Sequence, residues 1–102
     1  MNNNDALKIR AEKVIPGGMY GHMSVYRGMP EGYPQYFRRA EGCRLWDVDG
    51  NEYIDFMCSY GPMIAGYGNH RIRAAADAQR NELDIADAPA PLIVDLAEKF
   101  VS

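Results

Sequence analysis

The stretch LWDVDGNEYIDF, residues 45 to 56, decides how the middle of this chain folds. Its pattern D-V-D-G-N, which starts at Asp47, resembles the opening of a calcium-binding loop, whereas Asp-Gly between alternating apolar residues is typical of a β-hairpin. A calcium loop that starts at Asp47 needs glycine at its sixth position and glutamate at its twelfth, but Glu52 and Cys58 stand there. The sequence therefore predicts a hairpin, not a metal site.

A two-residue turn at Asp49-Gly50 sets the expected register of this hairpin, because both residue types tolerate the positive φ that such a turn requires. The resulting cross-strand pairs are Val48 with Asn51, Trp46 with Tyr53, Leu45 with Ile54 and Arg44 with Asp55. One pairing is unfavourable, since Asp47 would face Glu52 and like charges directly opposite each other are destabilising. A shift by one residue, with a bulge at Gly50, is the alternative.

The chain before the hairpin predicts one helix and a long irregular segment. Asn4 can cap a helix that begins at Asp5 and ends before Pro16-Gly17-Gly18. One face of this helix is expected to carry the apolar residues Leu7, Ala11, Val14 and Ile15. Residues 19–34 show neither helical nor strand periodicity, and an irregular segment of that length in a compact domain usually serves a site or an interface.

Three short strands and two further helices complete the prediction. The strands are expected at 35–39, 43–48 and 52–57, with turns at Glu41-Gly42 and Asp49-Gly50, and form an antiparallel meander. Asn69 can cap a second helix, whose inward face is expected to hold Ile72, Ala75, Ala76, Gln79 and Leu83. Pro91 opens a third helix, expected to turn inward Leu92, Ile93, Leu96, Ala97 and Phe100. The chain of 102 residues is long enough for at most one domain with a core.

Composition excludes several classes of protein. The net charge of −3 without a basic stripe gives no electrostatic support for nucleic-acid binding. No apolar run approaches the roughly 20 residues of a membrane-spanning helix, and the polar start MNNNDALKIR does not resemble a signal peptide. Cys43 and Cys58 are expected to be free thiols in a reducing cytoplasm, and His22 and His70 are too isolated to form a metal site.

Residue types alone indicate no catalytic set. Ser24 and Ser59 lack the base and the orienting group that a nucleophile needs, and neither lies in a G-x-S-x-G elbow. The three lysines, Lys8, Lys13 and Lys99, lie on helices expected to be amphipathic, and Lys8 and Lys13 have positions usual for solvent-facing side chains.

The order of three motifs is more informative than any one of them. VIPGG (residues 14 to 18), RAEGCRLWDVDGNEYIDF (39 to 56) and SYGPMIAGYG (59 to 68) together resemble the N-terminal region of class III pyridoxal-phosphate-dependent aminotransferases. The branch that contains glutamate-1-semialdehyde aminomutase is the most similar. The resemblance covers residues 6 to 101, which is nearly the whole chain.

This resemblance implies that the chain is an α+β segment of a fold-type I α/β enzyme, homodimeric and cytoplasmic. Residues 1–66 would belong to its small domain, and residues 67–102 would form helices that lead to the large domain. Pyridoxal 5'-phosphate (PLP) is the implied cofactor. The lysine, aspartate and phosphate-binding loop that hold the cofactor in this family would all lie beyond residue 102, so the segment alone is expected to be inactive.

The resemblance also implies substrate-binding residues for an amino acid or amine. Ser59, Tyr60 and Gly61 correspond to the loop that borders the active site, where Tyr60 takes the place of a substrate-contacting aromatic residue; the alternative is that its ring merely packs beside Pro62. Tyr20, His22 and Ser24 lie where the family's second substrate-binding segment is expected.

That second segment also departs from the aminomutases. Gly21 and Ser24 replace a serine and an arginine that lie near the substrate carboxylate in that branch, and Arg27 is a candidate substitute for the arginine. The change favours a relative that acts on another amine or amino acid over semialdehyde isomerisation.

A second hypothesis is a stand-alone module without catalysis, which binds a partner through exposed residues such as Met19, Tyr20, Met23 and Tyr26. The third helix distinguishes the two hypotheses. A self-sufficient module should bury its apolar face, whereas part of a larger enzyme would leave that face open.

Overall fold

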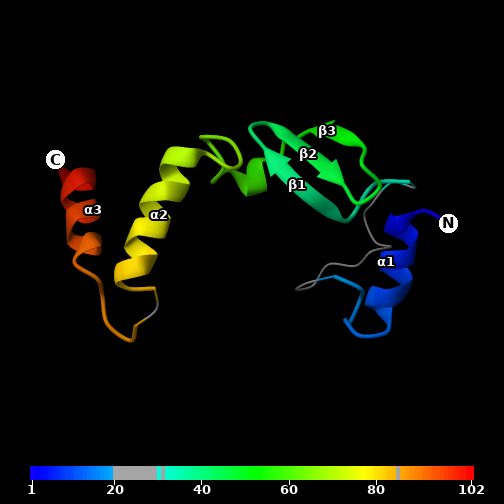
Figure 1. The fold of residues 1–102 in the computed structure, drawn as a ribbon, viewed down its shortest axis with the longest axis horizontal. Helices are drawn as coiled ribbons and strands as arrows, with labels where there is room; N and C mark the ends of the chain where they lie inside the picture. Colours follow the sequence, from blue (N-terminus) through cyan, green and yellow to red (C-terminus); the bar gives the residue numbers. More distant parts are fainter. Residues whose placement is uncertain (20–29, 31, 85) are drawn as a thin grey trace. The chain divides into compact units, whose positions relative to one another are not determined.

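The computed structural model describes residues 1–19, 30, 32–84 and 86–102, and these divide into two compact units, residues 1–69 and 70–102. The first unit contains α1 (Asn3–Glu12), β1 (Phe37–Glu41), β2 (Arg44–Asp47), β3 (Glu52–Ile54) and a short 3₁₀ turn, η1 (Cys58–Tyr60) (Figure 1). The second contains α2 (His70–Glu82) and α3 (Leu92–Val101). The predicted order of helix, three strands and two helices is therefore confirmed.

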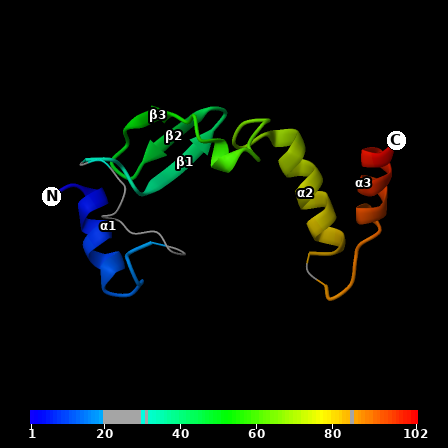
Figure 2. The same cartoon turned by 180° about the vertical axis from the view of Figure 1, so that it is seen from behind.

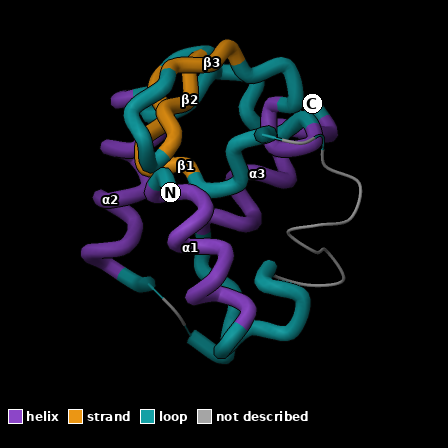
Figure 3. The backbone as a smooth tube through the Cα atoms, turned by 90° about the vertical axis from the view of Figure 1, so that its right-hand side faces the viewer, coloured by secondary structure: helices purple, strands orange, loops and turns teal. Residues whose placement is uncertain are grey.

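The strands form one antiparallel sheet in the order β1-β2-β3 (Figure 3). The hairpin of β2 and β3 pairs Trp46 with Glu52, Leu45 with Tyr53 and Arg44 with Ile54, so the register expected from a two-residue turn is wrong by one residue. Gly50 has φ 89° and its N–H donates to the Asp47 carbonyl oxygen at 3.2 Å. This is a three-residue turn with a glycine bulge, the alternative that the sequence left open.

Asp47 explains why the shifted register is preferred. The side chain is 4% exposed, and its Oδ1 accepts hydrogen bonds from the backbone N–H groups of Asp49 (2.9 Å) and Asn51 (2.8 Å). Its Oδ2 accepts from the Asn51 side-chain amide (2.9 Å) and from the Tyr53 hydroxyl (3.0 Å). The shift moves Asp47 away from its place opposite Glu52, so that the Asp47 carboxylate accepts the hydrogen bonds of the turn. The Glu52 side chain forms an ion pair with Arg44.

The burial of Asp47 also explains its titration. Desolvation by burial raises the pKa of this carboxyl, but the hydrogen bonds from Asn51, Tyr53 and Asp49 together outweigh it, and the net pKa is below its ordinary value of 3.8. The expected ion pair of Arg44 with Asp55 is absent from the described residues, because the shifted register places Ile54 opposite Arg44.

The first helix is capped differently from the prediction. Asn2, not Asn4, is the N-cap, and its Oδ1 accepts from the Asp5 N–H at 2.8 Å. Asn4 is buried, and its Oδ1 accepts from the backbone N–H groups of Gln35 (3.0 Å) and Tyr36 (3.3 Å), so it fastens α1 to the chain that enters β1. The sequence pattern of a cap does not reveal this contact because it joins residues about 30 positions apart.

The hairpin turn also supports α1. Asp49 accepts from the N–H groups of Asn3 (Oδ1, 2.8 Å) and Asn4 (Oδ2, 3.1 Å). A carboxylate at these free N–H groups neutralises the positive end of the helix dipole. The Asp49-Gly50 turn therefore closes the hairpin and holds the start of the first helix.

In the second unit, α2 and α3 are antiparallel to each other (Figure 2). The faces predicted to point inward are open to solvent: Leu92, Ile93, Leu96 and Phe100 of α3 are all exposed, Phe100 by 82%. The apolar face of α3 is thus not buried within the described residues, which is the outcome expected for part of a larger enzyme and not for a self-sufficient module. None of the described helices is both long and apolar enough to cross a membrane.

The expected hydrophobic core is small. Among the described residues Ala11 is the one buried apolar side chain, and many large apolar side chains are exposed in both units. Such extensive apolar exposure is typical of a surface that packs against further protein.

Candidate functional site

The loop that follows β3 begins with a carboxylate bound by two backbone groups. Oδ1 of Asp55 accepts from the Met57 N–H at 2.8 Å, and Oδ2 accepts from the Cys58 N–H at 3.1 Å. The Asp55 N–H itself donates to the Cys43 carbonyl oxygen at 2.8 Å, which anchors this residue to the sheet. The carboxylate therefore fixes the start of η1 relative to the strands.

The η1 turn has an unusual backbone. Cys58, Ser59 and Tyr60 have φ values of 50°, 51° and 65°, and Gly61 follows with φ 109°. A left-handed conformation costs a non-glycine residue about 1–2 kcal/mol, and it normally occurs at single positions. Three such residues in succession are held in place only if the surroundings enforce them. Hydrogen bonds from the N–H groups of Tyr60 to Met57 O (3.0 Å) and of Gly61 to Cys58 O (2.9 Å) close the turn.

Tyr67 connects the far end of the loop to its beginning. Its hydroxyl donates to Oδ2 of Asp55 at 2.6 Å and lies 3.0 Å from Oγ of Ser59. Its backbone N–H and carbonyl form a bridge with Gly42, at 2.8 and 2.9 Å. The loop of residues 55–67 is thus closed by side chains at both ends and docked on the turn between β1 and β2.

The titration of this pair follows from the same contacts. The hydrogen bond from Tyr67, aided by the N–H groups of Met57 and Cys58, lowers the pKa of the Asp55 carboxyl below its ordinary value of 3.8. The hydrogen bond to Asp55 raises the pKa of the Tyr67 hydroxyl above 10.0, although Ser59 opposes this shift. At neutral pH the arrangement is therefore a neutral tyrosine that donates to a charged carboxylate.

Three of the predicted site residues lie in the left-handed turn. Ser59, Tyr60 and Gly61 are consecutive in the left-handed turn; Ser59 contacts Tyr67, and Gly61 ends the turn. The Tyr60 side chain is 80% exposed, which argues against the alternative that its ring merely packs beside Pro62. The other predicted residues, Tyr20, His22 and Ser24, and the candidate Arg27, lie outside the described residues.

Sequence reasoning missed Asp55 and Tyr67 as parts of this loop. Asp55 was expected to pair with Arg44, and Tyr67 was not singled out. A usable signal was present, since an aspartate at the end of a strand often binds the N–H groups two and three residues ahead, and Tyr67 lies between two glycines. Gly66 also approaches Gly42 so closely that a side chain there would meet the backbone, at 3.1 Å from its carbonyl oxygen.

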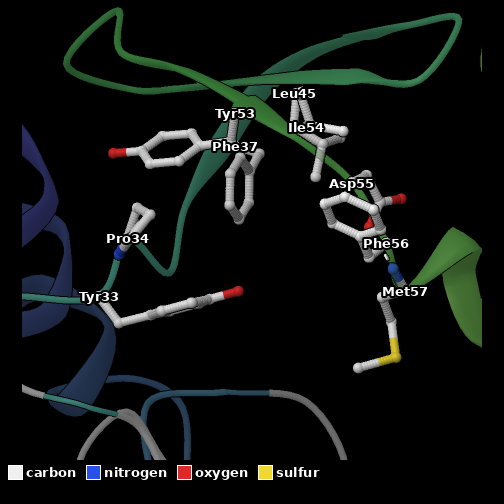
Figure 4. Close-up of a pocket in the computed structure, with 9 residues that line it drawn as sticks. All are labelled: Tyr33, Pro34, Phe37, Leu45, Tyr53, Ile54, Asp55, Phe56 and Met57. Atoms are coloured by element: carbon white, nitrogen blue, oxygen red, sulfur yellow. Dashed lines mark hydrogen bonds between the residues drawn. The ribbon is translucent and has the colours of Figure 1, made fainter.

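A cavity of about 390 Å³ lies on the sheet side of this loop (Figure 4). Its wall is mostly apolar and aromatic: Tyr33, Pro34, Phe37, Leu45, Tyr53, Ile54, Asp55, Phe56 and Met57. Phe37 and Tyr53 meet edge to face there, with ring centroids 6.0 Å apart. Ser59, Tyr60 and Gly61 do not line this cavity, so it is separate from the predicted substrate loop.

Comparison with known proteins identifies the family. The family model of aminotransferase class III matches residues 29–100. The chain belongs to the class III aminotransferase family. The predicted resemblance is thereby confirmed, and so is the fold-type I assignment, because the similar solved structures are PLP-dependent transaminases.

Two curated proteins are similar in sequence to this class III chain. It is 56% identical over 95 residues to an aminopentol aminotransferase of Sphingopyxis macrogoltabida, a match that covers 93% of this chain and 22% of the relative. It is 37% identical over 102 residues to a glutamate-1-semialdehyde 2,1-aminomutase of Methanothrix thermoacetophila, covering all of this chain and 23% of the relative. The chain therefore spans about a fifth of the length of the curated relatives it matches.

Solved structures agree. The PLP internal aldimine form of the FumI protein of Sphingopyxis sp. MTA144 matches with a TM-score of 0.86 and 54% identity, over 96% of this chain and 23% of that one. An omega-transaminase from Sphaerobacter thermophilus matches with a TM-score of 0.80 and 29% identity, over 95% of this chain and 21% of that one.

Class III aminotransferases require PLP, and the described residues of this chain do not form a site that fits it. Lys8, Lys13 and Lys99 lie on α1, just after it and on α3, and none of them lines the cavity beside the substrate loop. The described residues also contain no group of three or more histidine, cysteine or acidic side chains placed to hold a metal ion. The described residues therefore do not make a cofactor site by themselves.

Proposed function

We propose that this chain forms the N-terminal part of a PLP-dependent aminotransferase that acts on a hydroxylated amine. The observation that carries the proposal is the class III match over residues 29–100, together with 56% identity to an aminopentol aminotransferase. The left-handed turn that exposes Tyr60 supports it, since strained backbone of this kind clusters at active sites. The amino group moves from the amine to an oxo acceptor in this proposal.

The absence of a family arginine supports an amine without a carboxylate next to its amino group. At the positions where the semialdehyde branch has serine and arginine, this chain has Gly21 and Ser24. Loss of the guanidinium at this position removes a bidentate carboxylate clamp and places the Ser24 hydroxyl there, which suits a polyol; Arg27 is the candidate substitute that a carboxylate substrate would require. Isomerisation within a single substrate, the reaction named for the relative at 37% identity, is the alternative reaction.

The residues of this chain bind and orient substrate in this proposal. The exposed Tyr60 ring forms one wall of the pocket, where its face packs on the carbon chain and its hydroxyl bonds a substrate oxygen. Ser59 and Gly61 shape the same loop, and Tyr20, His22 and Ser24 contribute polar groups from the second segment. PLP supplies the electron sink for amino transfer, held by residues outside this chain.

The arrangement of the longer enzyme is part of the same proposal. Residues 1–66 belong to a small domain, and residues 67–102 lead to a large cofactor-binding domain. The division of the described structure after Asn69 supports this boundary. The enzyme is a cytoplasmic homodimer in this proposal, and the exposed apolar side chains of α3 supply surface for packing against further protein.

A panel of amine donors tests the function directly. The complete protein from its native source is incubated with an amino polyol, with and without a 2-oxo acid. We expect amine loss and formation of the matching amino acid only when the oxo acid is present. Amine consumption without any acceptor would indicate isomerisation, and no consumption of any amine would contradict the proposal.

The alternative of a stand-alone partner-binding module is tested by mass. Borohydride fixes lysine-bound PLP covalently, so the denatured native protein is treated and its intact mass is measured. A chain several times heavier than 11.4 kDa with one PLP adduct supports the enzyme. An unmodified chain of 11.4 kDa would favour the module, whose binding surface would then include the exposed α3 residues.

A further inference from the structure

The turn that presents Tyr60 has a backbone that its own sequence does not favour. Of the four successive residues with positive φ, only Gly61 belongs to a type that adopts this conformation readily. Cys58 and Ser59 carry side chains, and residues of these types normally have negative φ. Something outside the turn must therefore hold it, and that restraint also fixes the direction in which the Tyr60 side chain leaves the backbone.

Tyr67 is placed to provide this restraint. Two hydrogen bonds with Gly42 hold its backbone against the turn between β1 and β2, and this contact fixes the position from which its ring extends. Its hydroxyl then reaches both the Asp55 carboxylate (2.6 Å) and the Ser59 hydroxyl (3.0 Å). A single phenol oxygen therefore joins the start of the turn to its strained centre.

Asp55 is the fixed point of this network. It accepts from two backbone N–H groups at the start of the turn and from Tyr67, while its own N–H is bound to the sheet through Cys43. The lowered pKa of its carboxyl fits a charged acceptor, and charged acceptors form the shorter and stronger hydrogen bonds.

We propose that Tyr67 is a positioning residue for the substrate pocket: through Asp55 and Ser59 its hydroxyl holds the left-handed turn, and through the turn it sets the place of the Tyr60 ring. The inference rests on the proposed function, because it takes Tyr60 as a wall of the amine pocket. Tyr67 itself touches no substrate in this scheme. Tyr67 affects the binding of the amine substrate only by fixing the position of the Tyr60 ring.

A matched pair of variants separates positioning from stability. Tyr67→Phe removes the hydroxyl that reaches Ser59, and the control Tyr53→Phe removes the hydroxyl that donates to Asp47 at 3.0 Å in the hairpin turn. In the complete enzyme we expect Tyr67→Phe to raise KM for the amine on the order of tenfold, as expected for a displaced contact. Its kcat should change by less than about threefold, which indicates lost uniform binding. Tyr53→Phe should leave KM unchanged. Equal KM values for the two variants would overturn the proposal.

A double-mutant cycle tests whether Tyr67 acts through Tyr60. In a Tyr60→Ala background, Tyr67→Phe should have no further effect on KM, since the residue that it positions is gone. Independent, additive effects would overturn the proposal. If Tyr67→Phe does not fold, Ser59→Ala replaces it in the same cycle, with the same two outcomes.

A crystal structure of the Tyr67→Phe enzyme gives a readout that does not depend on turnover. We expect at least one of Cys58, Ser59 and Tyr60 to return to negative φ, with displacement of the Tyr60 ring. An unchanged turn would overturn the inference. Lack of amine turnover by the unmodified enzyme would instead contradict the proposed function alone, because the turn can still be compared.

Discussion

Two tyrosine–aspartate pairs in this chain use the same chemistry for different purposes. Tyr53 donates to Asp47 inside the hairpin turn, where the one residue with positive φ is Gly50. Tyr67 donates to Asp55 at a turn in which three residues with side chains have positive φ. The first pair stabilises a turn that its glycine already favours. The second pair holds a turn that would otherwise relax, and this difference separates a scaffold from a candidate site.

Gly66→Ala should have the largest effect on stability, because it disrupts the close backbone contact with Gly42 beside the bridge that holds Tyr67. A side chain at this position would meet the backbone of Gly42 at 3.1–3.3 Å and would also have to adopt φ 77°. Crowding and left-handed backbone together should lower the free energy of unfolding by about 3 kcal/mol. Urea denaturation measures this loss.

The control for that measurement is Gly32→Ala. Gly32 has φ 75°, and no atom lies within 4 Å of the position where a side chain would begin, so only the backbone cost of about 1–2 kcal/mol applies. Equal losses for the two variants would mean that the contact between Gly66 and Gly42 does not matter.

Tyr60→Ala should affect activity more than stability. Its ring is 80% exposed, so little packing is lost, whereas the proposed pocket loses a wall. We expect kcat/KM for the amine to fall about tenfold, which corresponds to roughly 1.4 kcal/mol of transition-state binding, with PLP content unchanged. Steady-state kinetics and cofactor absorbance provide the two measurements.

Ile64→Ala is the matched control, since Ile64 is 94% exposed and lies in the same loop. It should leave kcat/KM as it was. An equal loss of amine turnover and PLP in Tyr60→Ala would contradict its assignment as a substrate wall.

Replacing a glycine in one turn and introducing a glycine in the other compares the backbone strain of the two turns. Gly50→Ala should destabilise the protein by about 1–2 kcal/mol, because alanine is strained at φ 89° and finds open space around it. Cys58→Gly should do the opposite and stabilise the protein by up to about 1 kcal/mol, since relief of the strain at φ 50° exceeds the entropic cost of glycine. Thermal unfolding gives both signs, and destabilisation by Cys58→Gly would show that its turn is not strained.

The sequence predicted the elements better than the contacts between them. Asp49-Gly50 identified the hairpin, and Asn69 and Pro91 located the starts of α2 and α3 to within one residue. The predicted register was wrong because a two-residue turn was assumed, and that assumption did not include the four hydrogen bonds that the buried Asp47 carboxylate accepts. Local patterns carry no information about such a choice between two turns.

The candidate site was predicted in part for the same reason. Ser59, Tyr60 and Gly61 were found through a motif that resembles a family, and the family is confirmed. Tyr67 was missed because its importance comes from Gly42, 25 residues earlier, and from Asp55, 12 residues earlier. Strain at Cys58 and Ser59 is likewise invisible in the sequence, since neither residue type favours positive φ.

The smallest expected effect is a difference in acid stability between the two pairs. Both carboxyls have pKa values below 3.8 in the folded chain, so their contribution is present above about pH 3.8 and is lost as the pH falls through the folded pKa. Both tyrosines have pKa values raised above 10.0, so their contribution is fully present below about pH 10 and is lost as the pH rises through the folded pKa.

The two pairs differ in which hydrogen bond matters most. The bond from Tyr67 is the largest cause of the lowered pKa of Asp55, whereas Asn51 contributes more than Tyr53 to the lowering at Asp47. Tyr67→Phe should therefore reduce the loss of stability between pH 4 and pH 2 more than Tyr53→Phe does, as measured by urea midpoints across that range. Coulombic effects of Cys58 on the pKa of Tyr67 and of Asp49 on the pKa of Tyr53 add to the alkaline shifts, so the acid range gives the cleaner comparison. Identical acid profiles for the two variants would show that Asp55 depends on its backbone donors alone, and the distinction between the pairs would then rest on strain.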